Sequence, residues 1–253
     1  LRAWRAAGLP LLLVGLVWIA PQEFTRSSGT LSVSLLQPNV PQDLKFDPEH
    51  LQRILAWHEA ALARAKGQLV VTSESVIPLP LPALPADAVA ALRRPFSQGQ
   101  RAALLVVFLG DEQQGYTNSL VALSATSNPL RADAPGFYSY GKRHLLPFGE
   151  FIPPGFGWFV RAMNIPLADQ EPGRSSAPLQ VGSQRIRPLI CYEDLFGEDI
   201  AESVVGNEAA TMLANATNLA WFGRHMVQDQ HLQFSRMRAL EFQRPVVRST
   251  NTG

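Results

Sequence analysis

The chain has very little cysteine: among its 253 residues, Cys191 is the single one. One cysteine excludes an internal disulfide and a cysteine-rich zinc site. An excess of charge of one sign is also missing, because 22 Lys and Arg residues offset 21 Asp and Glu residues, without a long basic or acidic run. This balance argues against a dedicated nucleic-acid-binding protein, which usually carries a basic stripe.

Motifs for nucleotide, serine-nucleophile and metal chemistry are missing as well. The chain has no G-x-S-x-G segment and no glycine-rich phosphate loop. His225 and His231 lie six residues apart, which is poor spacing for one helical face, and no carboxylate completes a metal site. We therefore expect no metal and no nucleotide cofactor. The NAT sequon at 215–217 falls within a predicted strand, so it carries little weight as a glycosylation site.

The N-terminal segment is apolar, with no charged residue between Arg5 and Glu23. This run is slightly shorter than the ~20 residues that a spanning helix needs. A signal peptide would need an A-x-A cleavage site, and Pro10 would disturb a buried core helix. We interpret 1–23 as the last part of a transmembrane helix, with Arg2 and Arg5 at its cytoplasmic end.

The rest of the chain alternates strand-like and helix-like segments. With 46% hydrophobic and 17% charged residues, it can bury a large core. Expected strands cover 31–37, 68–74, 102–111, 118–125, 184–194, 210–218 and 245–251, and expected helices cover 46–67, 196–206 and 225–244. The proline-rich residues 77–88 are predicted to form a loop. The alternation predicts one α/β, or layered α+β, domain over residues 30–253.

Three candidate catalytic side chains lie at or near predicted strand ends: Glu74, Lys142 and Cys191. A thiol is a strong nucleophile only as the thiolate, so a carboxylate that takes its proton and an ammonium that stabilises its charge would activate it. Each residue also has an ordinary interpretation. A lone cysteine after an apolar strand is usually an inert buried residue, Glu74 could cap a helix, and Lys142 could belong to a solvated basic loop.

Four longer motifs occur together with this Glu, Lys, Cys order: GKRHLLPFGEFIP (141–153), CYEDLF (191–196), AWFG (220–223) and RMRALEFQRPVVRSTNTG (236–253). In this order they resemble the nitrilase superfamily of carbon–nitrogen hydrolases, and more narrowly the apolipoprotein N-acyltransferases of bacterial inner membranes. The resemblance runs from about residue 30 to the end of the chain. It implies a nitrilase-like four-layer αββα sandwich.

The resemblance also implies roles for individual residues. Glu74 would be the general base, Lys142 would stabilise the oxyanion, and Cys191 would be the nucleophile. The implied reaction moves an acyl chain from a phospholipid to Cys191 as a thioester, and then to the N-terminal amino group of a diacylglyceryl-modified apolipoprotein. The implied partners are the phospholipid, the apolipoprotein and the bilayer, with the catalytic domain on the periplasmic side.

Further residues would support this chemistry. Glu150 would orient or charge-balance Lys142. Tyr192 and Glu193 would shape the pocket beside the thiol, and the Tyr192 backbone N–H could join the oxyanion hole. The apolar residues 145–166 would form a lid that dips into lipid, with an alternative in which they pack on the core; its marked members are Phe148, Phe156 and Trp158.

The chain departs from the family pattern at a few positions. Phe46 stands where Trp is expected, Thr72 and Ser73 replace an aromatic residue and a proline before the base, and Leu219 replaces an Asp. These departures bear on substrate fit and rate more than on reaction type. The family pattern also leads us to expect a protein longer at both ends, and a marginally stable, aggregation-prone domain without further C-terminal strands.

Two other functions fit the same residues. A soluble amidase or nitrilase would use the same Glu-Lys-Cys triad on a small amide and would need no apolar N-terminal segment. An inactive nitrilase-fold scaffold would keep the fold without the reaction, although the retention of all three candidate catalytic residues argues against it.

Overall fold

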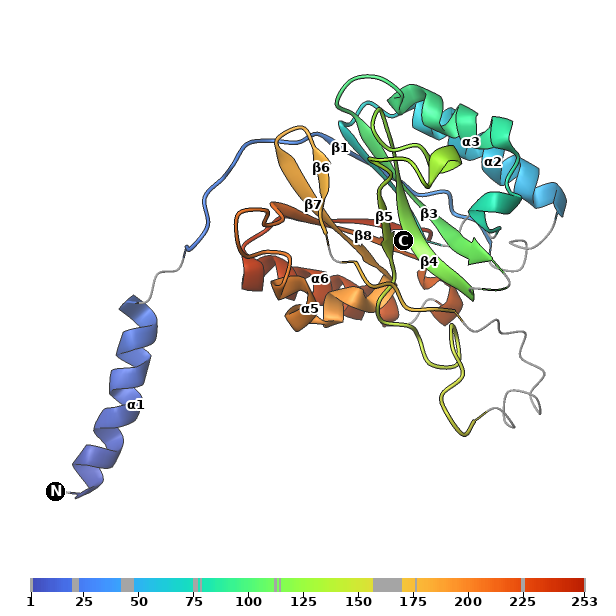
Figure 1. Ribbon diagram of the computed structural model, residues 1–253. Helices are drawn as coiled ribbons and strands as arrows, with labels where there is room; N and C mark the ends of the chain where they lie inside the picture. The colour runs from blue at the N-terminus through green and yellow to red at the C-terminus, as the bar shows by residue number, and fades with distance from the viewer. Residues whose placement is uncertain are drawn as a thin grey trace.

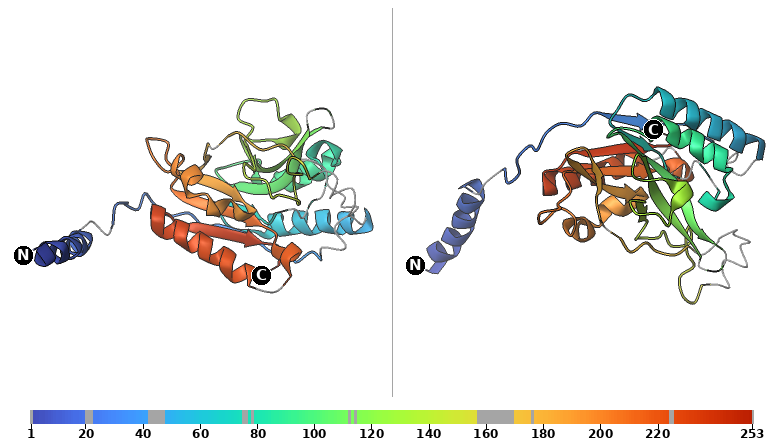
Figure 2. Two further views of the ribbon diagram at one scale, coloured as in Figure 1. Left: turned by 90° about the horizontal axis from the view of Figure 1, so that it is seen from below. Right: turned by 45° about the horizontal axis from the view of Figure 1, so that its top comes forward.

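The computed structural model describes residues 2–19, 23–41, 48–74, 77, 79–111, 113, 115–156, 170–175, 177–223 and 226–252. Two β-sheets face each other and each carries helices on its outer side (Figures 1 and 2). The layers therefore follow the order αββα, which confirms the expected sandwich.

The first sheet contains β1 (Val33–Leu36), β2 (Leu69–Thr72), β3 (Ala102–Asp111), β4 (Gly115–Ser124) and β5 (Ser139–Gly141), in that order. The first three strands are parallel, β3 and β4 form an antiparallel hairpin, and β5 is antiparallel to β4. All four residues of β2 are buried, as expected for a parallel strand covered on both faces. Sequence patterning missed the short strand β5.

The second sheet contains β6 (Leu179–Val181), β7 (Gln184–Ile190), β8 (Met212–Thr217) and β9 (Val246–Thr250). Strands β7, β8 and β9 are parallel, so their carboxyl ends lie at one edge of the sheet. The short strand β6, which was not predicted, pairs antiparallel with β7.

The alternation of side chains along each strand divides the core into layers. Leu69 and Val71 of β2 pack between the two sheets, whereas Val70 packs on the outer side of the first sheet. Helices α2 (Pro48–Arg64) and α3 (Ala86–Arg93) cover that outer side. Helices α5 (Gly197–Ala201) and α6 (Val227–Phe242) cover the second sheet (Figure 1). This packing holds the ends of the parallel strands in place.

Several sequence-based boundaries were wrong, among them the end of the predicted helix 196–206, since α5 ends at Ala201. The proline-rich segment 77–88 is not a plain loop: it contains the 3₁₀ helix η2 (Leu81–Ala83) and the start of α3, whose N-cap is Pro85. A proline suits the start of a helix, where its missing N–H leaves no hydrogen bond unmade. The predicted strand 184–194 ends at Ile190, and Cys191 begins the 3₁₀ helix η5 (Cys191–Leu195).

The described residues also form the short helices η3 (Arg94–Phe96), η4 (Pro129–Arg131) and η6 (Leu219–Phe222). The sequon NAT lies inside β8, where all three residues are buried. A buried strand is not accessible to glycosylation, in agreement with the small weight given to this motif.

Helix α1 (Arg2–Ile19) lies apart from the sandwich and includes Pro10 (Figure 1). Its large apolar residues from Leu9 to Ile19 are exposed. Among the described residues, none of the helices has both the length and the apolar character required to cross a bilayer. The interpretation of residues 1–23 as part of a transmembrane helix therefore stays a prediction.

Candidate active site

The three candidate catalytic residues come from both sheets and meet at one edge of the sandwich. Glu74 follows β2 by two residues, Lys142 follows β5 directly, and Cys191 follows β7 directly. The Lys142 Nζ atom lies 3.3 Å from Glu74 Oε1. The Cys191 thiol interacts electrostatically with both charged groups. The structure thus brings together residues that are far apart in the sequence.

Lys142 is a buried cation held between two carboxylates. Its side chain is 1% exposed, and its Nζ atom donates to Glu150 Oε1 at 2.8 Å as well as to Glu74. Burial alone would lower the pKa of Lys142, but the negative charges of Glu74 and Glu150, and that of Cys191 once its thiol ionises, outweigh burial and raise it well above its ordinary value. The ammonium therefore keeps its charge at neutral pH.

Asn118 of β4 is a site residue that the sequence did not reveal. Its Nδ2 group donates to Glu74 Oε1 at 3.0 Å and to Glu150 Oε1 at 3.3 Å. The second oxygen of each carboxylate accepts a backbone N–H, from Asn218 for Glu74 and from Leu146 for Glu150. The one available signal was an amide side chain at the first residue of the predicted strand 118–125. Asn118 fixes the spacing of the two carboxylates around Lys142.

Cys191 adopts a backbone conformation that is unusual for a cysteine. Its φ is +56°, in the left-handed region, which costs about 1–3 kcal/mol for a residue other than glycine. The Cys191 carbonyl accepts a hydrogen bond of 2.8 Å from the buried Asn215 side chain, which helps to hold this turn. An inert core cysteine at the end of a strand needs no such conformation. The turn instead directs Cys191 out of the strand at the site edge.

The thiol is protonated at rest. Burial and the negative charge of Glu74 raise the pKa of Cys191 to about 12, although Lys142 and the Thr217 hydroxyl lower it. A nucleophilic attack by Cys191 at neutral pH must therefore transfer the proton during the reaction. Glu74, an electrostatic neighbour of the thiol, is suited to accept it.

Glu193 joins the turn of Cys191 to the segment of Lys142. This buried carboxylate accepts the Ile190 N–H and the Arg143 N–H, each at 2.7 Å, and the Tyr140 hydroxyl at 2.8 Å. Burial raises the pKa of Glu193, while these donors oppose the rise. The three donors come from β5, the segment after it and β7. Glu193 thus supports the site by fixing two chain segments relative to each other.

Tyr192 borders the site from the residue after the thiol. Its hydroxyl donates to the Leu145 carbonyl at 2.9 Å, and its ring centroid lies 5.6 Å from Lys142 Nζ. A cation at this distance from an aromatic ring is attracted to it. The predicted supporting residues Glu150, Tyr192 and Glu193 thus all contact the elements that carry the triad.

Two of the predicted lid residues are exposed rather than packed in the core. Phe148 is 39% and Phe156 is 46% exposed. Their rings contact each other edge to face, with centroids 5.5 Å apart. Trp158 lies outside the described residues. For Phe148 and Phe156, these exposures disfavour the alternative in which the segment packs on the core.

Three of the departures from the family pattern lie in the core. Thr72 is buried and donates to the Leu104 carbonyl at 3.1 Å, which adds a side-chain bond between β2 and β3. Ser73 and Leu219 are also buried. Phe46 lies outside the described residues. Within the described ranges, no group of three or more His, Cys, Asp or Glu side chains is arranged to hold a metal ion.

Two curated relatives are similar in sequence to most of the chain. The apolipoprotein N-acyltransferase of Verminephrobacter eiseniae is 46% identical over 90% of the chain, and that of Ralstonia nicotianae is 44% identical over 98%. The chain spans 42% and 45% of the lengths of these relatives.

Solved structures share the fold at low sequence identity. One is a carbon–nitrogen hydrolase superfamily protein of Xanthomonas campestris with an arsenic adduct in its active site (TM-score 0.60, 19% identity, 87% of this chain and 75% of that chain). Another is an amidase mutant of Nesterenkonia sp. with a covalent adduct at its active-site cysteine (TM-score 0.57, 16% identity, 90% and 79%). The family model for carbon–nitrogen hydrolases matches residues 32–253. The chain belongs to the carbon–nitrogen hydrolase family.

Proposed function

We propose that this chain carries the catalytic domain of an apolipoprotein N-acyltransferase of the bacterial inner membrane. One observation carries the proposal: Glu74, Lys142 and Cys191 form a buried group. They do so in a chain that is 44% and 46% identical to two curated enzymes of that name. The substrates are then a phospholipid as acyl donor and a lipid-modified apolipoprotein as acceptor.

In the first step the Cys191 Sγ atom attacks the carbonyl carbon of a phospholipid acyl ester, and Glu74 takes the thiol proton. The carbonyl oxygen becomes an oxyanion. When the tetrahedral intermediate collapses, the ester C–O bond breaks and the departing alkoxide takes the proton from Glu74. Lysophospholipid leaves, and the acyl group stays on Cys191 as a thioester.

In the second step the amino group of the acceptor attacks the thioester carbon. Glu74 takes a proton from that nitrogen, the C–S bond breaks, and the departing sulfur takes this proton from Glu74. The acceptor leaves as an amide and the enzyme returns to its starting state. Splitting the transfer at a thioester replaces one difficult step with two easier ones.

Lys142 suits the stabilisation of both oxyanions. An ammonium has three N–H donors, and the contacts with Glu74 and Glu150 engage two of them. The third would face the oxyanion together with the backbone N–H of Tyr192. The loss of one such donor typically costs ~2.7–4 kcal/mol of transition-state stabilisation.

The size of an acyl chain favours catalysis at a bilayer surface. About 15 methylenes, each worth ~0.8 kcal/mol on transfer from water, give roughly 12 kcal/mol. An enzyme that exposed this chain to water in every cycle would face a barrier of that order. Exposed Phe148 and Phe156 are suited to a lid that contacts lipid, with Trp158 at the headgroup level. The catalytic domain would then lie on the periplasmic side, with residues 1–23 as part of a membrane segment.

Mass spectrometry of the full-length protein after incubation with phospholipid tests the proposed function. The peptide that contains Cys191 should gain the mass of one acyl group, and hydroxylamine should remove it. The variant Cys191→Ala should gain none. Hydrolysis of a small amide by the wild type, without any retained acyl group from phospholipid, would instead support the soluble amidase.

A further inference from the structure

Asn251, which directly follows β9, is buried and bonded through every polar group it has. Its backbone N–H donates to the Thr217 carbonyl at 3.1 Å, and its backbone carbonyl accepts the Asn39 N–H at 3.1 Å. Its side-chain oxygen accepts the Val40 N–H at 2.9 Å. Its side-chain NH₂ donates to the Val40 carbonyl at 2.9 Å and to Asn218 Oδ1 at 3.2 Å. The residue is 1% exposed, so no water replaces these partners.

Asn218 is the link from Asn251 to the proposed base. The backbone N–H of Asn218 donates to Glu74 Oε2 at 3.1 Å. Its side-chain oxygen accepts from Asn251 and from the Ala220 N–H. The peptide that carries this N–H also carries the Thr217 carbonyl, which accepts the Asn251 backbone N–H at 3.1 Å. Asn251 therefore contacts both this peptide and the Asn218 side chain, and its side-chain amide holds the Asn218 side chain beside the N–H that points to Glu74.

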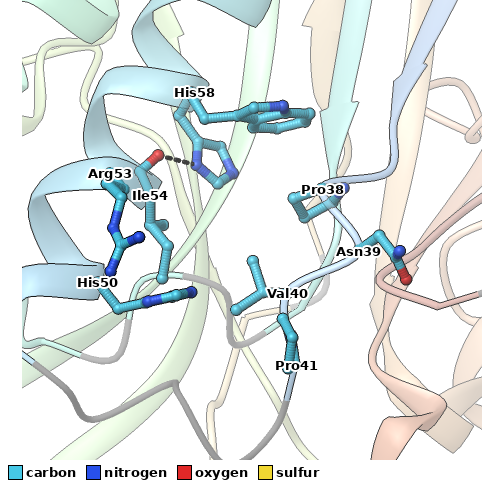
Figure 3. Close-up of a pocket in the computed structure, with 9 residues that line it drawn as sticks. Pro38, Asn39, Val40, Pro41, His50, Arg53, Ile54 and His58 are labelled. Atoms are coloured by element: carbon cyan, nitrogen blue, oxygen red, sulfur yellow. Dashed lines mark hydrogen bonds between the residues drawn. The ribbon is translucent and has the colours of Figure 1, made fainter.

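The other partner of Asn251 is the loop that follows β1. Asn39 in this loop has a φ of +54°, in the left-handed region. Figure 3 shows Val40 pointing into a pocket of about 160 Å³ beside α2, while Asn39 points away from it. The loop thus has a cavity on one side and Asn251 on the other. Its two bonds through the Val40 backbone attach it to the end of β9.

An asparagine is well matched to this place. The Val40 N–H needs an acceptor, while the Val40 carbonyl and Asn218 Oδ1 both need donors. A side-chain amide supplies one oxygen acceptor and two N–H donors, whereas an ionised aspartate supplies acceptors alone. We propose that Asn251 is a positioning residue: it joins the loop after β1 to Asn218 and so holds Glu74 in the orientation from which it takes the thiol proton. The inference rests on the proposed role of Glu74 as base.

The pH dependence of Cys191 alkylation by iodoacetamide, measured in the full-length protein, tests this inference. Without a positioned base, alkylation depends on free thiolate, so its rate should rise about tenfold per pH unit below the pKa of the thiol. With a positioned base the dependence should be shallower. Asn251→Ala should slow alkylation at pH 7 on the order of tenfold, less than the ~10²–10⁴ of a whole general base. In this variant the alkylation rate should also rise more steeply with pH than in the wild type.

Ser249→Ala is the matched control. Ser249 lies on the same strand, is buried, and donates to the Leu36 carbonyl at 2.8 Å. This variant therefore loses a bond between β9 and β1 without touching Asn218. It should keep the wild-type pH dependence even if its melting temperature falls as far as that of Asn251→Ala.

A second variant covers the case in which Asn251→Ala does not fold. Asn251→Asp keeps the size and the acceptor but loses the donors, and it should also steepen the pH dependence. A wild-type pH dependence in a folded Asn251 variant, or an equal change in Ser249→Ala, would overturn the positioning role. If the wild type never forms an acyl-enzyme but the alkylation rates behave as expected, the proposed acyl transfer is wrong and the positioning role of Asn251 is still supported.

Discussion

At the residue scale, the site combines a permanent cation with a thiol that resists ionisation. Lys142 stays charged because Glu74 and Glu150 surround it, and Cys191 stays protonated because it is buried beside Glu74. The same carboxylate that raises the pKa of Cys191 is the group placed to take its proton. In the proposed mechanism, catalysis would therefore depend on proton transfer during the attack rather than on a stored thiolate.

The variant Glu74→Gln tests that dependence. The change keeps size and removes the proton acceptor, so alkylation of Cys191 should slow at pH 7 by ~10²-fold or more. Removal of the negative charge also lowers the pKa of the thiol, which works in the opposite direction. As pH rises, the fraction of thiolate in the variant increases, and the alkylation rate should recover before the pH reaches about 12, the pKa of the wild-type thiol. An unchanged rate at pH 7 would show that Glu74 is not the base.

Lys142→Met separates transition-state stabilisation from binding. The substitution keeps length and removes charge, so the rate of thioester formation should fall by ~10²–10³ or more. Binding of phospholipid should change little, because the ammonium would act on the oxyanion and not on the headgroup. Single-turnover acylation beside equilibrium phospholipid binding gives both quantities. Normal turnover with weaker binding would make Lys142 a headgroup contact.

At the scale of elements, the sequence predicted which strands exist better than how they end. Alternating and apolar runs located β1, β2, β3, β4, β7, β8 and β9, and caps located α2. The left-handed turn at Cys191 was not predicted, because partners far along the chain help to hold it: the Asn215 side chain donates to the Cys191 carbonyl, and Glu193 accepts the Arg143 N–H. The short strands β5 and β6 were missed, because three residues give no readable period. Asn118 was missed because its partners lie in other segments of the chain.

The exposed loop that follows β5 is the element suited to contact lipid. Phe148→Ser combined with Phe156→Ser should weaken the binding of the protein to phospholipid vesicles, because it removes exposed apolar surface that a bilayer would cover. Alkylation of Cys191 by a small water-soluble reagent should not change. Leu240→Ser is a suitable control, since Leu240 is an exposed apolar residue of α6 on the outer side of the second sheet. A joint loss of vesicle binding and thiol reactivity would show that the loop is part of the core.

At the scale of the whole molecule, the alternation of strands and helices predicted the class, and the motifs predicted the sandwich. Local sequence patterns alone do not predict how the two sheets face each other, because β5 is far from η5 in the sequence and meets it through contacts such as that of Tyr140 with Glu193. The site exists only once both sheets are packed, since its base and its thiol come from different sheets. On unfolding, activity should therefore be lost together with the packing of the two sheets and not at an earlier stage.

The free energy of unfolding of the whole fold should depend on pH through buried His58 on α2 (Figure 3). Its Nδ1–H donates to the Ile54 carbonyl at 2.8 Å, and its Nε2 atom is buried without a partner. Burial lowers the pKa of His58 from 6.5 to about 4. Between these values the unfolded chain binds a proton that the folded chain does not, so acidification favours unfolding by up to about 3 kcal/mol. His58→Leu removes this proton uptake. From pH 7 to pH 4.5, denaturant unfolding of the wild type should therefore lose roughly 2–3 kcal/mol more than that of the variant, and parallel curves would mean that His58 titrates alike in both states.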